Sequence, residues 1–216
     1  MSVAVLDNKL WFPKPEEALS DGLLAIGGDI SVERLLLAYK SGIFPWYDGD
    51  LPLWWNPDPR FVLFPNEIKI SKSLQSSLKK NQFVFKVNTS FVDVMQCCKN
   101  IPRFNQDGTW INDELIKVYE KLHQMGYAFS AESWLNNKLV GGLYGIKIGK
   151  IFFGESMFSK KSNASKFAFA KYIEVLKSEG IVIIDCQIYT EYLESFGARM
   201  IQRNEFMYIL HNHINS

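Results

Sequence analysis

The sequence predicts an α+β protein, with helices packed on a mixed, mostly antiparallel sheet and a small N-terminal domain in front. Three strand-like runs follow one another at 128–135, 139–149 and 150–158. The pairs Asn136-Asn137 and Gly149-Lys150 lie between them and are typical of hairpin turns. A helix and a buried strand come next, and elements in this order fit one sheet covered by helices.

The helix after the hairpins is predicted over 163–179, where apolar residues recur at helical spacing. The run IVIIDCQ at 181–187 is almost continuously apolar and rich in β-branched residues, which is typical of a buried central strand. Capping and stop signals predict two earlier helices, at 89–99 and 112–125.

The first sixty residues differ in composition from the rest, because prolines and tryptophans are concentrated there. One helix is predicted in this part, with Ser31 as its cap and Gly42 as its stop. The Pro-rich stretch at 42–60 is predicted to be an ordered loop, since its aromatic side chains would otherwise lie in water. We therefore expect two domains, 1–61 and 62–216.

Composition narrows the functional classes. The formal net charge of +1 argues against a protein coated by nucleic acid, although a local basic patch fits it. The three cysteines show no metal-ligand spacing and suit a reducing compartment, and no apolar run is long enough to span a bilayer. Three scattered histidines give a metal site no support. We expect a cytoplasmic protein, a monomer, with no membrane partner.

The triplet Asp185-Cys186-Gln187 ends the predicted buried strand. Strand side chains alternate, so Asp185 and Gln187 are expected on one face and Cys186 on the other. A carboxylate in an apolar strand is costly unless it is paired or has a task. A structural Asp bonded to a loop and a catalytic Asp explain this residue equally well, whereas Cys186 fits core packing.

Two further charged features stand out. Glu155 lies within the apolar run FFGESMF, either as a partner in a buried salt bridge or as a fixed anion that awaits a cationic ligand. Residues 66–88 hold five lysines against one acid, Glu67. Such stretches are usually solvated faces, but this concentration in a nearly neutral chain also fits contact with phosphates.

Several runs together resemble the leucyl/phenylalanyl-tRNA–protein transferases, in the order and spacing of that family. They are GLLAIGGDIS, AYKSGIFPWY, WWNPDPR, GTWI, LVGGLYG, FFGESMFS, NASK and IDCQ. The resemblance extends from about residue 11 to residue 210, and FGESMFS and IDCQ on either side of NASK are its most specific part.

This resemblance implies an N-acyltransferase-like C-terminal domain, and the predicted order of elements agrees with that fold. It also implies transfer of Leu or Phe, and Met less well, from aminoacyl-tRNA to proteins that begin with Arg or Lys, which marks them for degradation. The reaction needs neither metal nor other cofactor, because the donor is already an activated ester.

Matching positions receive roles from the resemblance. Asp185 and Gln187 form the family's proposed catalytic pair, Glu155 is expected to hold the acceptor's N-terminal Arg or Lys, and Trp46 is expected to stack on the terminal adenosine of the tRNA. The pocket for the donated side chain maps onto Trp110, Leu143, Phe152, Met157, Phe169, Tyr172, Leu176 and Ile184. Four lysines of the basic window are candidates for tRNA backbone contacts: Lys69, Lys72, Lys79 and Lys80.

The free α-amine of an acceptor has a pKa near 7.7–8.0, so a modest proton acceptor suffices. A neutral amide barely accepts protons. Our hypothesis from the sequence therefore makes Asp185 the group that favours deprotonation of the amine, while Gln187 fixes the amine and the carbonyl.

Two other functions are each compatible with part of the sequence. A coenzyme A-dependent N-acetyltransferase would share the fold, but the segment ahead of the long helix lacks the Gly-rich loop that cradles pyrophosphate. A non-catalytic tRNA-binding module has only the basic window in its favour. The chain also departs from the common family pattern at Asn56, Phe129 and Tyr192, which touches fine substrate preference rather than the reaction.

Overall fold

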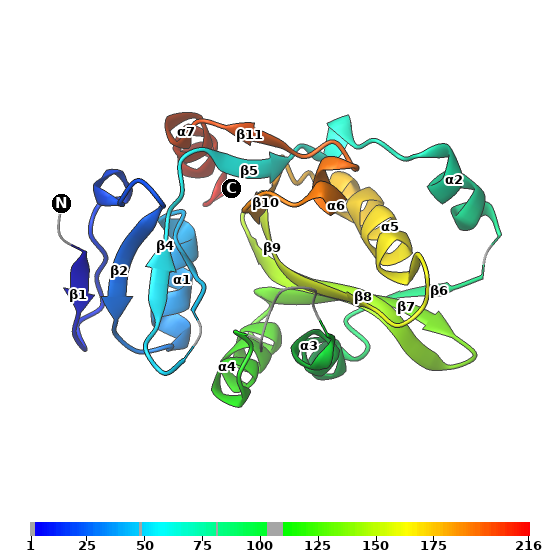
Figure 1. Cartoon of the computed structure of the whole chain (residues 1–216), viewed down its shortest axis with the longest axis horizontal. Helices are drawn as coiled ribbons and strands as arrows, with labels where there is room; N and C mark the ends of the chain where they lie inside the picture. The colour runs from blue at the N-terminus through cyan, green and yellow to red at the C-terminus, as the bar shows by residue number, and fades with distance from the viewer. Residues whose placement is uncertain (1–2, 48, 81, 103–109) are drawn as a thin grey trace.

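The computed structural model describes residues 3–47, 49–80, 82–102 and 110–216. Gly108 and Thr109 of the GTWI run therefore lie outside the described residues. Two sheets are present in the described part, and the chain passes from the first to the second near residue 60 (Figure 1). None of the described helices is both long and apolar enough to cross a membrane.

The first sheet has four short strands in the order β1-β2-β4-β3. β1 runs parallel to β2, and the other neighbours are antiparallel. The bounds are β1 Ala4–Leu6, β2 Leu23–Gly27, β3 Phe44–Pro45 and β4 Leu53–Trp55. The Pro-rich stretch was predicted to be a loop, but it contains β3 and β4. These two strands bury Phe44 and Trp54 in the core.

The second sheet has seven strands in the order β11-β5-β10-β9-β8-β7-β6. All its neighbours are antiparallel except β9 and β10, which are parallel. The bounds are β5 Arg60–Leu63, β6 Val84–Val87, β7 Ala128–Leu135, β8 Lys138–Ile148, β9 Ile151–Ser159, β10 Ile183–Gln187 and β11 Arg199–Ile201. The predicted α+β class with a mixed, mostly antiparallel sheet is confirmed. β5 spans the predicted domain boundary, and the division itself stays a prediction.

Helices cover both faces of the larger sheet. α5 packs on one face of β7, β8 and β9, while α3 and α4 lie on the other (Figure 1). The bounds are α1 Val32–Lys40, α2 Lys72–Lys79, α3 Phe91–Asn100, α4 Asp113–Gln124, α5 Ala164–Ser178, α6 Glu191–Glu194 and α7 Arg203–His213, with 3-10 turns at Pro15–Glu17 and Pro65–Glu67.

The strongest local signals of the sequence are confirmed. The four helices predicted around residues 31–42, 89–99, 112–125 and 163–179 are α1, α3, α4 and α5. Both residues of the Asn136-Asn137 pair adopt positive φ in the turn between β7 and β8. The predicted buried strand is β10, which lies inside the larger sheet between β5 and β9.

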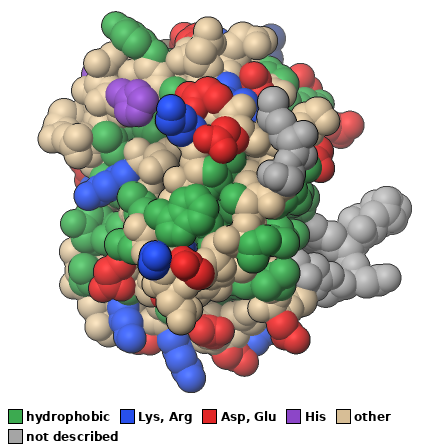
Figure 2. All heavy atoms as spheres, turned by 90° about the vertical axis from the view of Figure 1, so that its left-hand side faces the viewer, with side chains coloured by type: hydrophobic (Ala, Val, Ile, Leu, Met, Phe, Trp, Pro, Cys, Tyr) green, Lys and Arg blue, Asp and Glu red, His purple; other side chains and the backbone are tan. Residues whose placement is uncertain are grey.

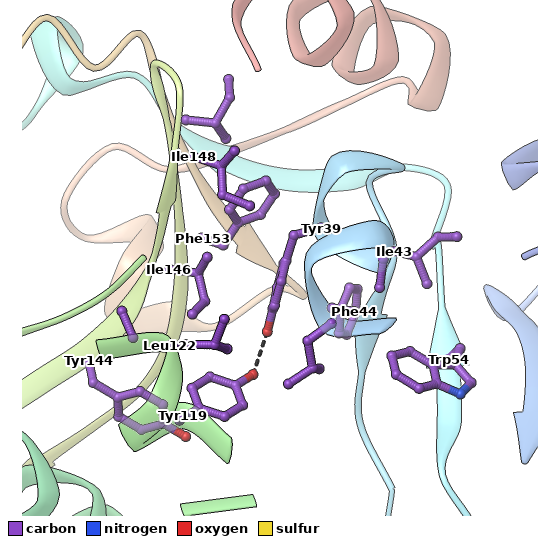
Figure 3. Close-up of a cluster of buried hydrophobic side chains, with 14 of the residues drawn as sticks. Tyr39, Ile43, Phe44, Trp54, Tyr119, Leu122, Tyr144, Ile146, Ile148 and Phe153 are labelled. Carbon is purple, nitrogen blue, oxygen red and sulfur yellow. Dashed lines mark hydrogen bonds between the residues drawn. The ribbon is translucent and has the colours of Figure 1, made fainter. Parts of the chain in front are cut away.

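Two buried apolar clusters fill the fold. One joins the two sheets and includes Tyr39 of α1, Trp54 of β4 and Phe153 of β9 (Figure 3). The other lies between α5 and the larger sheet and includes Leu143, Phe152, Phe169, Tyr172, Leu176 and Ile184. Most of the side chains expected to hold the donated amino acid therefore belong to the second core.

Close approach explains one glycine of β8. Gly145 lies at a register shift between β8 and β9. A Cβ atom placed there would lie 2.3 Å from the carbonyl oxygen of Phe153 and 2.4 Å from the Phe152 ring. Glycine inside a strand typically marks a bulge or a close backbone approach, and Gly145 shows both.

We predict that Gly145→Ala destabilises the protein by about 1–3 kcal/mol, because the added methyl group overpacks the core. Urea unfolding would measure the loss. Gly154→Ala is the matched control on β9, since its nearest Cβ contact would be the Asp185 carbonyl oxygen at 3.7 Å. Equal losses in the two variants would contradict the role of close packing at Gly145.

Candidate active site

A cavity opens where β9 and β10 separate. The two parallel strands pair from Ile183 to Asp185 against 151–153, after which β9 continues to Ser159 while β10 ends at Gln187. The cavity has a volume of about 620 Å³. Phe44 and Trp46 from the first sheet side, α5 and the segment after β10 complete its walls. The separation of β9 and β10 in the interior thus exposes apolar core residues to the cavity.

The walls contain most of the pocket residues named from the sequence. Of the described lining residues, the ones that were predicted are Trp46, Trp110, Leu143, Phe152, Glu155, Met157, Phe169, Ile184 and Gln187. Tyr172 and Leu176 are buried but do not line the cavity. The Tyr172 ring stands edge-on behind Phe152, with ring centroids 5.3 Å apart, so these two residues support the wall rather than form it.

Asp185 is fully buried and does not line the cavity. Arg60 of β5 binds its carboxylate through two parallel hydrogen bonds, 2.8 Å from Nε to Oδ1 and 2.7 Å from Nη2 to Oδ2. The guanidinium of Arg60 lies between the rings of Phe44 and Phe206, 4.7 Å from each centroid. A buried carboxylate held in this way is paired, oriented and shielded from water.

The strand does not alternate through its last residues as the sequence predicted. The register between β10 and β5 shifts between Asp185 and Gln187, and Gln187 adopts φ = 67°. Its backbone N–H donates to Oδ1 of Asp185 at 2.9 Å. Consequently Cys186 and Gln187 both line the cavity, whereas Asp185 points away from it. The expected common face for Asp185 and Gln187 is wrong because this bulge turns the strand.

Glu155 lies partly exposed in the cavity wall and accepts three hydrogen bonds from neutral groups. Its Oε1 accepts from the Tyr39 hydroxyl at 2.8 Å and from Nε2 of Gln187 at 3.0 Å. Its Oε2 accepts from the Tyr119 hydroxyl at 3.1 Å. The two phenols, from α1 and α4, also meet each other (Figure 3). Among the described residues Glu155 has no ion pair, so the alternative of a buried salt bridge is not found.

Burial raises the pKa of Glu155 to about 7, although the hydrogen bonds from Tyr39 and Tyr119 act against this shift. Burial first, and then the charge of Glu155, raise the pKa of both phenols well above the usual value. The phenols therefore stay protonated as donors, and Glu155 changes charge close to neutral pH.

Cys186 lines the cavity, but its environment keeps the thiol protonated. Burial, and then the nearby Asp185, raise the pKa of Cys186. A thiolate is the reactive form of cysteine, so this residue serves as a wall of the cavity. No group of three His, Cys, Asp or Glu in the part of the chain that the structure describes could hold a metal ion.

Sequence reasoning missed four residues of this site. Arg60, Tyr39 and Tyr119 are remote from the DCQ triplet in sequence, and their partners became visible only in the fold. Tyr192, noted as a departure from the family pattern, lines the cavity and donates to the Ser165 hydroxyl at 3.2 Å. Arg60 and Tyr39 were present in quoted runs, and a buried charge at Asp185 was the signal that called for a cation.

The lysines of the basic window lie on and beside α2, and Lys69, Lys72, Lys79 and Lys80 are all exposed. α2 lies at the end of the molecule opposite the four-stranded sheet (Figure 1). On the face at the four-stranded sheet, basic and acidic side chains are intermixed around apolar ones (Figure 2). The basic window is therefore separate from that face.

Trp46 stands at the rim of the cavity with 36% of its surface exposed. Its ring packs against Trp55, with centroids 5.7 Å apart. An exposed aromatic ring held by a second ring at the mouth of a cavity is suited to stacking on a flat ligand group.

Comparison with known proteins places the chain in a family. The family model described as leucyl/phenylalanyl-tRNA protein transferase matches residues 62–211, and the model of its N-terminal domain matches residues 28–58. The leucyl/phenylalanyl-tRNA–protein transferase of Flavobacterium johnsoniae is 54% identical, over 95% of this chain and 97% of its own length. The enzyme of that name from Syntrophobacter fumaroxidans is 49% identical, over 99% and 92%.

Among solved structures, a GCN5-related N-acetyltransferase-like protein from Streptococcus suis is 11% identical, with a TM-score of 0.39 over 74% of this chain and 60% of that one. These values are too low to carry an argument. The sequence matches are decisive, and the chain belongs to the leucyl/phenylalanyl-tRNA–protein transferase family.

Proposed function

We propose that this chain transfers leucine or phenylalanine, and methionine less well, from aminoacyl-tRNA to the α-amine of proteins that begin with Arg or Lys. The observation that carries the proposal is the cavity itself. It combines a long apolar wall with one carboxylate, Glu155, and the amide of Gln187, which touch each other. An apolar donor side chain and a cationic acceptor can meet there.

The apolar wall suits the donated side chain. Leu143, Phe152, Phe169 and Ile184 are rigid core residues, and the flexible thioether of Met157 adapts to side chains of different shape. One methylene in such a pocket is worth only about 1–3 kcal/mol, so β-branched amino acids are rejected by shape near Cβ. Trp46 stacks on the terminal adenosine and so places the ester in front of the pocket.

The polar groups divide the remaining work. Glu155 attracts the Arg or Lys side chain and thereby brings the acceptor's α-amine to Gln187. The Gln187 amide orients the amine against the ester carbonyl, and positioning of this kind supplies much of the acceleration for an ester that is already activated. Asp185 does not reach the cavity, so it acts through Gln187, in contrast to the direct role in our hypothesis from the sequence.

The exposed lysines on and beside α2 contact the tRNA backbone, because phosphate contacts need accessible cations rather than shaped pockets. The protein works in the cytoplasm as a monomer, where the added Leu or Phe marks its acceptors for degradation. The two domains, 1–61 and 62–216, contribute Trp46 and the pocket respectively.

Transfer of labelled Leu from Leu-tRNA should occur to a peptide that begins with Arg and not to one that begins with Ser. Glu155→Gln removes the anion while keeping the shape, so it should raise KM for the Arg peptide. Acetyl-coenzyme A in place of the charged tRNA should give no product, and acetylation would favour the coenzyme A-dependent alternative.

The same assay at increasing salt reports on the lysines. The rate at limiting tRNA should fall steeply with salt, because phosphate contacts release counterions. A flat response would remove Lys69, Lys72, Lys79 and Lys80 from the tRNA interface.

Acceptor binding should weaken as pH falls from 8 to 6. Glu155 is anionic above its pKa of about 7 and neutral below it. One unit below a pKa about one carboxyl in ten is ionised, so affinity should drop roughly tenfold. The acceptor amine gains charge over the same range, which would strengthen attraction to an anion, so the loss comes from the enzyme. Titration of an Arg peptide without donor measures it, and Glu155→Gln should bind weakly at all pH values.

The Arg60–Asp185 pair can be tested apart from folding. Arg60→Met alone should cost about 3–5 kcal/mol, since it leaves Asp185 buried and unpaired. The double variant Arg60→Met/Asp185→Leu removes both charges and should recover most of that stability. It should still transfer at least about 100-fold more slowly, because Gln187 loses its anchor. A stable double variant with the original rate would show that the pair does not orient Gln187.

A further inference from the structure

The carboxylate of Glu155 is nearly saturated before any substrate arrives. Each carboxylate oxygen offers about two positions for hydrogen-bond donors. Both positions of Oε1 are occupied, by the Tyr39 hydroxyl at 2.8 Å and the Gln187 amide at 3.0 Å. One position of Oε2 is occupied, by the Tyr119 hydroxyl at 3.1 Å. Among the described residues no other donor reaches Glu155, so one position remains open, and it is on Oε2.

The two tyrosines do not yield easily to a ligand. Both side chains are fully buried, and neither lines the cavity. They reach Glu155 from the core between α1, α4 and the larger sheet (Figure 3). A hydroxyl displaced from the carboxylate could donate only to the other phenol, so it would exchange a charge-assisted bond for a weaker one between neutral groups.

The number of open positions decides how a cation can bind. A guanidinium gains most from a carboxylate by placing two parallel N–H groups on both oxygens, which requires one open position on each. An ammonium needs a single position. With Oε1 closed, a guanidinium is confined to Oε2, and it loses its geometric advantage over an ammonium.

We propose that Tyr39 is a specificity-determining residue: its hydroxyl closes Oε1 of Glu155, limits acceptor cations to one carboxylate oxygen, and so lets the site accept Lys and Arg with similar efficiency. This inference rests on the proposed function, because it concerns how the acceptor side chain is read. Tyr119 bonds the other oxygen and leaves this restriction unchanged.

The test compares Tyr39→Phe with Tyr119→Phe, a matched pair in which each variant removes one phenolic hydroxyl from the same carboxylate. For each, kcat/KM is measured with two peptides that differ only in beginning with Arg or Lys. Tyr39→Phe opens one position on each oxygen and should raise the Arg-to-Lys ratio about tenfold, the worth of one added charge-assisted bond. Tyr119→Phe should leave the ratio within about twofold, because Oε1 remains closed.

An unchanged ratio in Tyr39→Phe, or an equal rise in both variants, would overturn the inference. If the unmodified enzyme transferred to neither peptide, the proposed function would fail instead, so the two failures are distinguishable. Thermal unfolding of both variants checks that the ratios are measured on folded protein.

A probe of the unmodified enzyme makes the test independent of the variants. Methylation of a guanidinium keeps its charge but blocks bidentate hydrogen bonding. A peptide that begins with symmetrically dimethylated Arg should therefore be used within about threefold as well as one with Arg. A loss of tenfold or more would mean that Arg already engages both oxygens, and the inference would be wrong.

Discussion

The buried ion pair between Arg60 and Asp185 is the constraint on which the geometry of the site depends. It joins β5 to β10 at the level where β10 parts from β9. Two buried charges are tolerated there because Nε and Nη2 of Arg60 bond both carboxylate oxygens of Asp185, and the guanidinium also packs against two aromatic rings. The pair fixes Asp185, Asp185 holds the backbone of Gln187, and the bulge at Gln187 directs its amide to Glu155.

The site thereby separates apolar and polar tasks within one cavity. Its apolar wall is a surface of the core under α5, so a donor side chain meets residues that are already packed and ordered. Its polar wall is a set of hydrogen bonds that links four separate elements, α1, α4, β9 and β10. Both walls are ordered before substrate binds. The donor side chain and the acceptor cation therefore bind to groups that do not need to rearrange.

Much of the fold followed from local sequence signals, because hairpin turns, capped helices and an apolar strand are written in neighbouring residues. α5, β10 and the Asn136-Asn137 turn are examples. The short strands of the first sheet and α7 carry weak local signals, since pairing and burial against remote elements stabilise them. The pocket residues followed from the family resemblance, and the roles of Asp185 and Gln187 remain proposals.

The sequence did not reveal which distant residues contact one another. Alternation along β10 predicted a shared face for Asp185 and Gln187, but a bulge follows from tertiary contacts and has no local code here. Arg60 lies 125 positions from Asp185, and Tyr39 lies 116 positions from Glu155. A single sequence contains no record of such pairs, whereas the buried charges at Asp185 and Glu155 did indicate that partners had to exist.

The position of Tyr39 in the chain has a consequence for how the site is assembled. This phenol belongs to α1, which lies before the larger sheet in the chain, whereas Glu155 and the apolar slot belong to that sheet. Without the contacts of the first sixty residues, the larger sheet would keep the apolar wall under α5 but lose Tyr39 at Glu155, together with Phe44 and Trp46 of the cavity wall. Similar use of Lys and Arg as acceptors is thus a property of the assembled protein, and it is lost before the capacity to hold an apolar side chain is.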